Sequence, residues 1–145
     1  MRRDLRSGRD LEVAYGAMSA ASPSDRNLFS ALDSAWLDGY AGARALKLGR
    51  TTEAAEIYEA VLSRTDARLV WERTVALTQL ATVRALEGEM EHACRLLTQA
   101  VEMAAATGNT SGVMMALRVR EQQLARWRSD PCVRQVDELF RSVPM

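Results

Sequence analysis

The sequence predicts an all-α fold made of antiparallel helical hairpins. Apolar residues recur at i, i+3, i+4 and i+7 in two long stretches, which is the spacing of one helix face. These residues are Ala54, Ile57, Tyr58, Val61 and Leu62, and then Ala93, Leu96, Leu97, Ala100, Val101 and Ala104. No stretch alternates apolar and polar residues between turn signals, so we expect no β-strand. The turn residues Gly49 and Gly88 lie 39 residues apart, which indicates a repeated helix–turn–helix unit.

Glycine and proline mark the ends of the expected helices. Gly49 and Gly88 suit the left-handed residue that ends a helix, and Thr51 is expected to cap the helix that follows Gly49. Gly108 begins a second stop-and-start signal, and Ser129-Asp130-Pro131 combines a capping side chain with a first-turn proline. The resulting seven helices span about 9–21, 25–48, 51–64, 67–87, 90–107, 111–128 and 131–142.

Short connections between these helices predict one domain over residues 1–145, because helices joined by short loops lie antiparallel as neighbours. Residues 1–24 are expected to supply a capping helix, and the three hairpins are 25–64, 67–107 and 111–142. Helices that cross closely need small residues at the contact. The residues expected there are Gly42, Ala54, Ala81, Ala93 and Ala100.

The composition argues against several classes of function. The formal net charge is zero, with 19 basic and 19 acidic residues, so the chain has no basic field for nucleic acid. No apolar run approaches the roughly 18 residues that a membrane span needs. The arginine-rich N-terminus has no apolar stretch behind it, so we expect a cytoplasmic protein rather than a secreted one. The cysteines, Cys94 and Cys132, form no C-x-x-C pair, so neither a disulfide framework nor a zinc site is expected.

The hairpin around Gly88 resembles a tetratricopeptide repeat (TPR). Leu80-Ala81, Gly88, Ala93 and Ala100 keep the spacing of that repeat, and the hairpin around Gly49 resembles it more loosely. The departures are Arg84 and Leu77, where the repeat usually has aromatic residues, and Ala105, where it often has proline. The resemblance implies a short right-handed solenoid whose hairpins stack side by side.

A second resemblance covers most of the chain, and it is strongest from Trp127 to Leu139. The run Trp127-Arg128-Ser129-Asp130-Pro131, followed by a short acidic terminal helix, is similar to the C-terminal TPR-like tail of bacterial helix-turn-helix transcriptional regulators. Such regulators carry a DNA-binding domain ahead of the tail, and this sequence shows no recognition helix. The resemblance therefore implies the sensor or interaction part of a transcriptional regulatory system, without direct DNA binding by this chain.

No set of residues predicts catalysis, a metal site or a cofactor. His92 lies beside Glu91 at the expected start of a helix, but no motif places a Ser or Cys nucleophile next to it. Cys94 would point about 200° around the helix from His92, so these two cannot form a dyad. No glycine-rich phosphate loop is present. We expect a chain that is not an enzyme, although a deep pocket holding His92 or Cys132 would reopen that question.

The resemblance to TPR folds implies a binding face lined by the first helix of each hairpin. On this basis the expected partner is a protein or peptide segment, and Thr78 and Thr82 are expected to face solvent. The expected partner-binding residues are Trp36, Ala43, Lys47, Val75, Thr78, Thr82, Glu121 and Gln122, with Leu86 beside them. Ala43, Thr78 and Thr82 do not supply the Lys and Asn that would grip a peptide carboxylate, so recognition of that charged end is not expected.

Two alternatives remain open at this point. The chain could be a structural homo-oligomerisation domain, such as a homodimer, with no separate ligand. The arginines of the densest basic stretch could instead bind an acidic partner segment. These arginines are Arg118, Arg120, Arg126 and Arg128.

Overall fold

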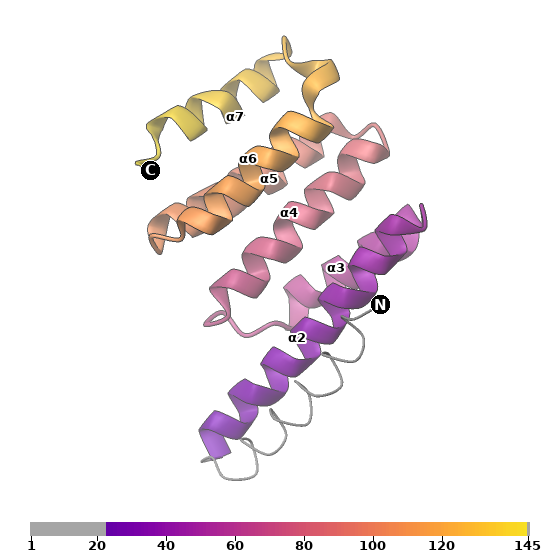
Figure 1. The fold of residues 1–145 in the computed structure, drawn as a ribbon, viewed down its shortest axis with the longest axis vertical. Coiled ribbons are helices and arrows are strands. Elements are labelled where there is room, and N and C mark those ends of the chain that lie inside the picture. The colour runs from indigo at the N-terminus through magenta and orange to yellow at the C-terminus, as the bar shows by residue number, and fades with distance from the viewer. Residues whose placement is uncertain (1–22, 145) are drawn as a thin grey trace.

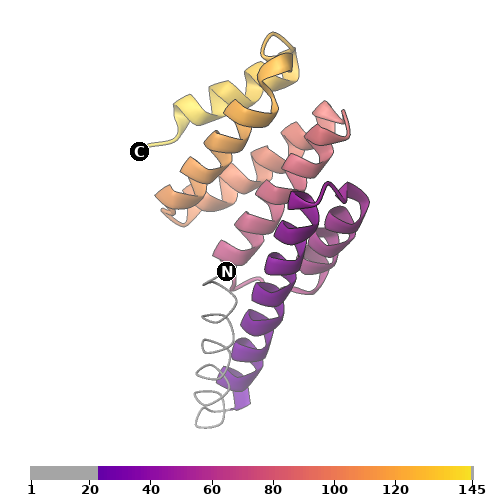
Figure 2. The same cartoon turned by 45° about the vertical axis from the view of Figure 1, so that its right-hand side comes forward.

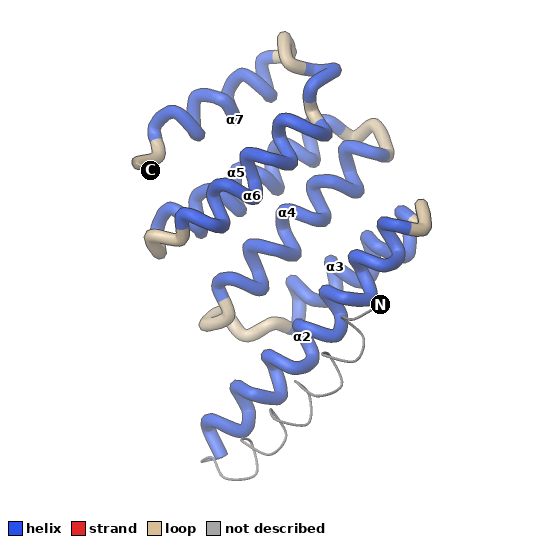
Figure 3. The backbone as a smooth tube through the Cα atoms, viewed as in Figure 1, coloured by secondary structure: helices blue, strands red, loops and turns tan. Residues whose placement is uncertain are grey.

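A computed structural model describes residues 23–144. The surroundings of the side chains are described for residue 34 and for residues 36–144. The described chain is helical and contains no strand (Figure 3), which confirms the all-α prediction. Its six α-helices are α2 (Pro23–Lys47), α3 (Thr51–Arg64), α4 (Val70–Leu86), α5 (Met90–Ala106), α6 (Thr110–Gln123) and α7 (Pro131–Ser142). A short 3₁₀ turn, η1 (Ala125–Trp127), follows α6. The helix expected at 9–21 lies outside the described residues.

Three of the helices form a layer that faces the viewer in Figure 1. Helices α2, α4 and α6 lie side by side there and run in the same direction, and Figure 2 shows the same order from another angle. Helix α4 packs against both α2 and α3, and α6 packs against both α4 and α5. Helix α7 packs against α5. We call α2, α4 and α6 the α2–α4–α6 layer.

The turns lie where the sequence places them. Gly49, Gly88 and Gly108 have φ values of 75°, 82° and 66°, the left-handed region that glycine enters without steric cost. Asp130 caps α7 by accepting a hydrogen bond of 2.9 Å from the Cys132 backbone N–H, and Pro131 is the first helical residue. These turn predictions are confirmed, because each depends on residues that are adjacent in the chain.

One predicted cap and two predicted helix ends differ from the structure, while the predicted span of α3, 51–64, agrees with it. Thr51 is not the N-cap of α3; Arg50 occupies that position without a side-chain cap. Helix α4 begins at Val70 rather than at 67, because Asp66 accepts hydrogen bonds from the Arg68 backbone and side chain and holds a turn there. Helix α6 ends at Gln123 rather than at 128, because the chain tightens into η1.

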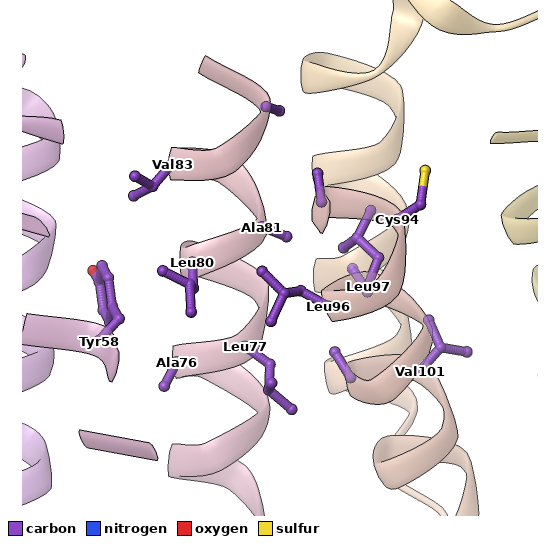
Figure 4. Close-up of a cluster of buried hydrophobic side chains, with 14 of the residues drawn as sticks. Tyr58, Ala76, Leu77, Leu80, Ala81, Val83, Cys94, Leu96, Leu97 and Val101 are labelled. Atoms are coloured by element: carbon purple, nitrogen blue, oxygen red, sulfur yellow. The ribbon is translucent and has the colours of Figure 1, made fainter. Parts of the chain in front are cut away.

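The core lies between the packed helices and contains small residues at the closest contacts. Ala54, Ala81, Ala93 and Ala100 are wholly buried, as expected for positions where helices approach closely. Figure 4 shows Tyr58, Leu80 and Leu97 among the larger side chains that fill the spaces between these helices.

Two glycines lie at even tighter contacts between helices. A Cβ at Gly42 would stand 2.5 Å from Cζ of Tyr58, so α2 and α3 can approach only because that position has no side chain. A Cβ at Gly112 would stand 2.9 Å from Cβ of Ala104 and 3.2 Å from Cγ2 of Thr74. Gly112 therefore lets α6 sit close to both α4 and α5.

Candidate interaction surface

Large hydrophobic side chains are exposed on only one group of helices in the described part of the chain. All seven belong to the α2–α4–α6 layer or to the residue that follows α2. They are Trp36, Leu37, Tyr40, Leu48, Trp71, Leu86 and Met114. A concentration of exposed apolar side chains on one side of a protein typically marks a surface that binds another molecule.

One face of α4 lies open at the centre of this layer. Its residues follow i, i+4, i+8, i+11 and i+15, so they form a single line along the helix. We call this line the open strip of α4: Trp71, Val75, Gln79, Thr82 and Leu86. Trp71 is 44% exposed and Leu86 is 54% exposed, and the three residues between them are half-buried. The strip thus has an apolar residue at each end, and Val75 with the neutral polar residues Gln79 and Thr82 between them.

Thr78 does not belong to this strip, and its expected position facing solvent is wrong. The residue is wholly buried, and its hydroxyl donates a hydrogen bond of 2.7 Å to the Thr74 backbone carbonyl. Thr74 is buried as well, and its methyl group lies where α6 approaches at Gly112. Helix α6 therefore covers the Thr74–Thr78 side of α4, and the open face is turned away from it.

The other expected binding residues divide into two groups. Trp36, Ala43 and Lys47 are exposed on α2, and Gln122 is exposed on α6. Val75 and Thr82 lie on the open strip, but the Thr82 hydroxyl is already bonded to the Thr78 carbonyl at 3.2 Å. These six positions remain on or beside the α2–α4–α6 layer.

Glu121 is exposed on α6, one position after Arg120 and three positions after Arg118. Its charge helps to raise the pKa of Arg120, and the larger cause of that shift is the hydrogen bond from Arg120 to Asp137 on α7. Glu121 therefore also lies on a helix of the α2–α4–α6 layer, outside the open strip of α4.

Sequence reasoning missed Trp71 and Gln79. The sequence pattern that could have identified them is a second line of small side chains on α4. These residues are all buried, and they are Thr74, Thr78, Ala81 and Ala85. A line of small residues at i, i+4, i+7 and i+11 is typical of a face on which another helix packs closely. The open face must then be the neighbouring line that includes Trp71, Gln79 and Leu86.

A pocket of about 360 Å³ lies where α4 and α6 end. It is lined by Ala85, Leu86, Gln122, Gln123, Ala125 and Arg126. Nη2 of Arg126 donates a hydrogen bond of 3.1 Å to the Ala85 carbonyl, and the Arg126 guanidinium carbon lies 3.8 Å from the centroid of the Trp127 ring. These contacts fix one wall of the pocket, and the Ala85 carbonyl, in the last turn of α4, also accepts a hydrogen bond of 3.0 Å from the Gly88 backbone N–H. Leu86 belongs both to the lining of this pocket and to the open strip, so the pocket adjoins the strip.

The basic stretch on α6 and η1 is largely committed to contacts within the chain. Arg120 forms a bidentate pair with Asp137, at 2.6 Å and 3.0 Å, which ties α6 to α7. Arg126 makes the contacts described above. Arg118 and Arg128 are exposed and form no ion pair with a described residue. The stretch therefore offers a partner two separate cations instead of four.

A groove of about 520 Å³ between α5 and α7 holds both cysteines. Burial raises the pKa of Cys94 to about 11, and partial burial raises the pKa of Cys132, so both groups are thiols at neutral pH. His92 lines a different depression, where its Nδ1 lies 3.6 Å from a Glu89 carboxylate oxygen. The arrangement provides no activated nucleophile with a base beside it.

Comparisons with protein-family models, with curated proteins and with solved structures each find no match. Among the described residues, no three His, Cys, Asp or Glu side chains are grouped so that they could hold a metal ion. No helix of the described chain is long and apolar enough to cross a membrane. The exposed apolar layer with its pocket is thus the feature of the molecule best suited to a function.

Proposed function

We propose that the chain is a non-catalytic module that binds a protein or peptide segment on the α2–α4–α6 layer. We further propose that its hairpins stack as a short right-handed TPR-like solenoid. The packing order supports this arrangement, because the first helix of each later hairpin contacts both helices of the hairpin before it. Small residues at the closest contacts, such as Ala81 and Ala93, also support it.

The observation that carries this proposal is the segregation of exposed hydrophobic residues to one layer. The exposed residues of the other helices are mainly charged or polar, for example Glu56 on α3, Gln99 on α5 and Arg134 on α7. Complete burial of an exposed Leu side chain contributes about 1.5–3 kcal/mol, and covering the exposed half of Leu86 contributes a corresponding part of that. Trp71 is also about half exposed and is a larger side chain. A partner that covers both residues would gain most of its affinity from these apolar contacts.

Polar groups on the same surface would orient the partner rather than hold it strongly. The Gln79 and Gln122 amides can donate and accept neutral hydrogen bonds. The Thr82 hydroxyl can only accept one, because it already donates its proton to the Thr78 carbonyl. Apolar contacts and neutral hydrogen bonds are little affected by salt. The affinity of the proposed complex should therefore change only modestly with ionic strength.

The cellular role that we propose is the sensor or interaction part of a bacterial transcriptional regulatory system in the cytoplasm. The resemblance of the segment from Trp127 to Leu139 to the tails of such regulators supports this role. Binding of a partner to the α2–α4–α6 layer would then provide the sensing step, and DNA would be contacted by another domain or protein.

A homo-oligomer is the second candidate function. Trp36 stacks on Tyr40 with ring centroids 6.3 Å apart, and Leu37 beside them is 45% exposed. A second copy of the chain could cover this part of α2. Sedimentation analysis would then show a dimer that Leu37→Glu converts to a monomer.

Selection from a display library of short random peptides tests the proposed binding function. The wild-type domain and the double variant Trp71→Ser/Leu86→Ser would be panned in parallel. The matched control is Glu56→Ser/Gln99→Ser, which changes two exposed side chains on α3 and α5, outside the α2–α4–α6 layer. We expect peptides to be enriched on the wild type and on the control, and to be lost on the Trp71/Leu86 variant.

Two other results would contradict the proposal. Equal enrichment on all three proteins would place binding elsewhere on the molecule. No enrichment on any of them, with each protein shown to be folded by circular dichroism, would argue against a peptide-binding function.

A further inference from the structure

We infer that the partner segment is an acidic, amphipathic peptide whose apolar residues lie on the open strip of α4 and whose carboxylates reach cations on both sides of it. This inference rests on the proposed binding function and adds the chemical class of the partner. It follows from where charges are paired and unpaired on the surface.

The α2–α4–α6 layer has exposed cations that are unpaired within the part of the chain that the structure describes. The side chains of Arg44, Lys47 and Arg118 form no ion pair or hydrogen bond with a described residue. Lys47 is the last residue of α2, and Arg118 lies on α6. These two helices lie on either side of α4 in Figure 1, so a segment lying along α4 would run between the helices that carry the two cations.

Most of the other described arginines have their charge neutralised within the chain. The ion pairs are Arg50 with Glu53, Arg64 with Asp38, Arg68 with Asp66, Arg84 with Glu59 and Glu87, Arg120 with Asp137, and Arg141 with Glu138. Three described arginines outside the layer, Arg95, Arg128 and Arg134, also lack an ion pair and a hydrogen bond. They are spread over α5, the turn after η1 and α7, and the exposed Glu91 and Glu102 share α5 with Arg95.

Most exposed carboxylates without an ion pair lie outside the layer. Glu56 on α3 and Glu91 and Glu102 on α5 are exposed and form no ion pair with a described residue. Within the layer, Glu72 is half-buried in the first turn of α4, and Glu121 is exposed on α6. Among the side chains that the structure describes, the layer therefore has more exposed cations without an ion pair (Arg44, Lys47 and Arg118) than exposed carboxylates without one (Glu121).

An apolar strip between two cations selects a particular pattern in its partner. Residues such as Leu or Phe would cover Trp71, Val75 and Leu86, and Asp or Glu residues on either side would approach Lys47 and Arg118. Charge complementarity of this kind contributes more to selectivity and association rate than to affinity. The modest salt dependence expected for the apolar contacts is therefore compatible with a strong preference for acidic segments.

Nucleic acid is a less suitable occupant of the same surface. A phosphate backbone needs a row of cations, whereas the strip itself presents Trp71, Val75, Gln79, Thr82 and Leu86, none of which is charged. Competition by a single-stranded oligonucleotide provides the experimental comparison.

The test uses the same display library of short random peptides with a charge-reversed pair of variants. Lys47→Glu/Arg118→Glu reverses the two flanking cations. Arg95→Glu/Arg134→Glu is the matched control, because it reverses two exposed, unpaired cations on α5 and α7. The affinity of one enriched peptide is then measured for each protein by fluorescence anisotropy, at low and at high salt.

We expect peptides enriched on the wild type to contain more Asp and Glu than the unselected library. Lys47→Glu/Arg118→Glu should bind the enriched peptide about tenfold more weakly at low salt, and the difference should shrink at high salt. The control should bind like the wild type, and the oligonucleotide should not compete.

Three results would overturn the inference. Enriched peptides without an acidic bias that still depend on Trp71 and Leu86 would leave the proposed function standing and remove only its acidic partner. An equal loss of peptide affinity in both charge-reversed variants would indicate that the overall charge of the protein attracts the peptide, instead of specific contacts with Lys47 and Arg118. Effective competition by the oligonucleotide would replace the peptide with nucleic acid.

Discussion

The Arg126 guanidinium closes the C-terminal end of α4 by donating a hydrogen bond of 3.1 Å to the Ala85 carbonyl, which is 41 residues earlier in the chain. The same guanidinium stacks on the Trp127 ring. This contact joins the turn after α6 to the last turn of α4 and forms a wall of the pocket between them. The architecture of the candidate surface therefore depends on a residue that the sequence presents only as part of a basic stretch.

Removing this contact should destabilise the domain. Arg126→Met loses the hydrogen bond to a helix-end carbonyl and the cation–π contact, and we expect a loss of about 1 kcal/mol in the free energy of unfolding. Arg128→Met is the matched control, because Arg128 is exposed and has no side-chain partner among the described residues. Urea titration of both variants measures the difference. Equal effects would mean that the Arg126 contact contributes nothing to stability.

Two glycines on α2 should respond in opposite directions to substitution by alanine. A Cβ at Gly42 would overlap the Tyr58 ring, so Gly42→Ala should cost about 1–3 kcal/mol. A Cβ at Gly39 would meet nothing within 4 Å, so Gly39→Ala should stabilise α2 by about 0.5–1 kcal/mol. Chemical denaturation compares the two directly. A stabilising effect at both positions would contradict the close approach of α2 and α3.

Ala93 lies wholly buried on α5, in the core between the helices. We expect Ala93→Leu to overpack the contact and to lower the free energy of unfolding by about 1–3 kcal/mol. Ala106→Leu provides the control on the same helix, because Ala106 is exposed and should tolerate the change. A thermal melt in which both variants match the wild type would show that the helices can separate at Ala93 without cost.

Tyr58 should make stability depend on pH in alkaline solution. Burial raises the pKa of Tyr58 to about 12, compared with an ordinary value near 10. Between these values the unfolded chain loses the phenolic proton and the native chain keeps it, so stability falls as the pH rises from about 10 to 12. The buried Tyr58 hydroxyl has no hydrogen-bond partner in the described structure, so Tyr58→Phe should be at least as stable at neutral pH.

The measurement is urea denaturation of wild type and Tyr58→Phe at a series of pH values. The wild type should lose about 2 kcal/mol relative to the variant across the alkaline range. Parallel curves for the two proteins would show that Tyr58 ionises as readily in the native state as in the unfolded chain.

The parts of the fold that depend on neighbouring residues could be predicted from the sequence. Gly49 and Gly88 end helices because glycine adopts positive φ without cost, and Asp130 with Pro131 begins α7 for equally local reasons. The burial of Ala81 and Ala93 also followed from helical spacing, since a small residue on an apolar stripe marks a close contact.

The orientation of α4 could not be predicted in the same way. Thr78 is polar and was expected to face solvent, but its hydroxyl is satisfied by the Thr74 carbonyl one turn earlier, so burial costs little. Which face of α4 becomes covered is decided by the position of α6, and that position depends on the contact at Gly112. Arg126 is similar, because its partner Ala85 is distant in sequence.

The most direct test of the account is to locate the binding site by NMR with an enriched peptide from the library. The indole N–H signal of Trp71 serves as the reporter, because Trp71 is exposed on the open strip of α4. The account predicts that the peptide shifts the Trp71 indole signal and the amide signals of α4 and the facing turns of α2 and α6. An unchanged Trp71 signal, with shifts confined to α5 and α7, would contradict it.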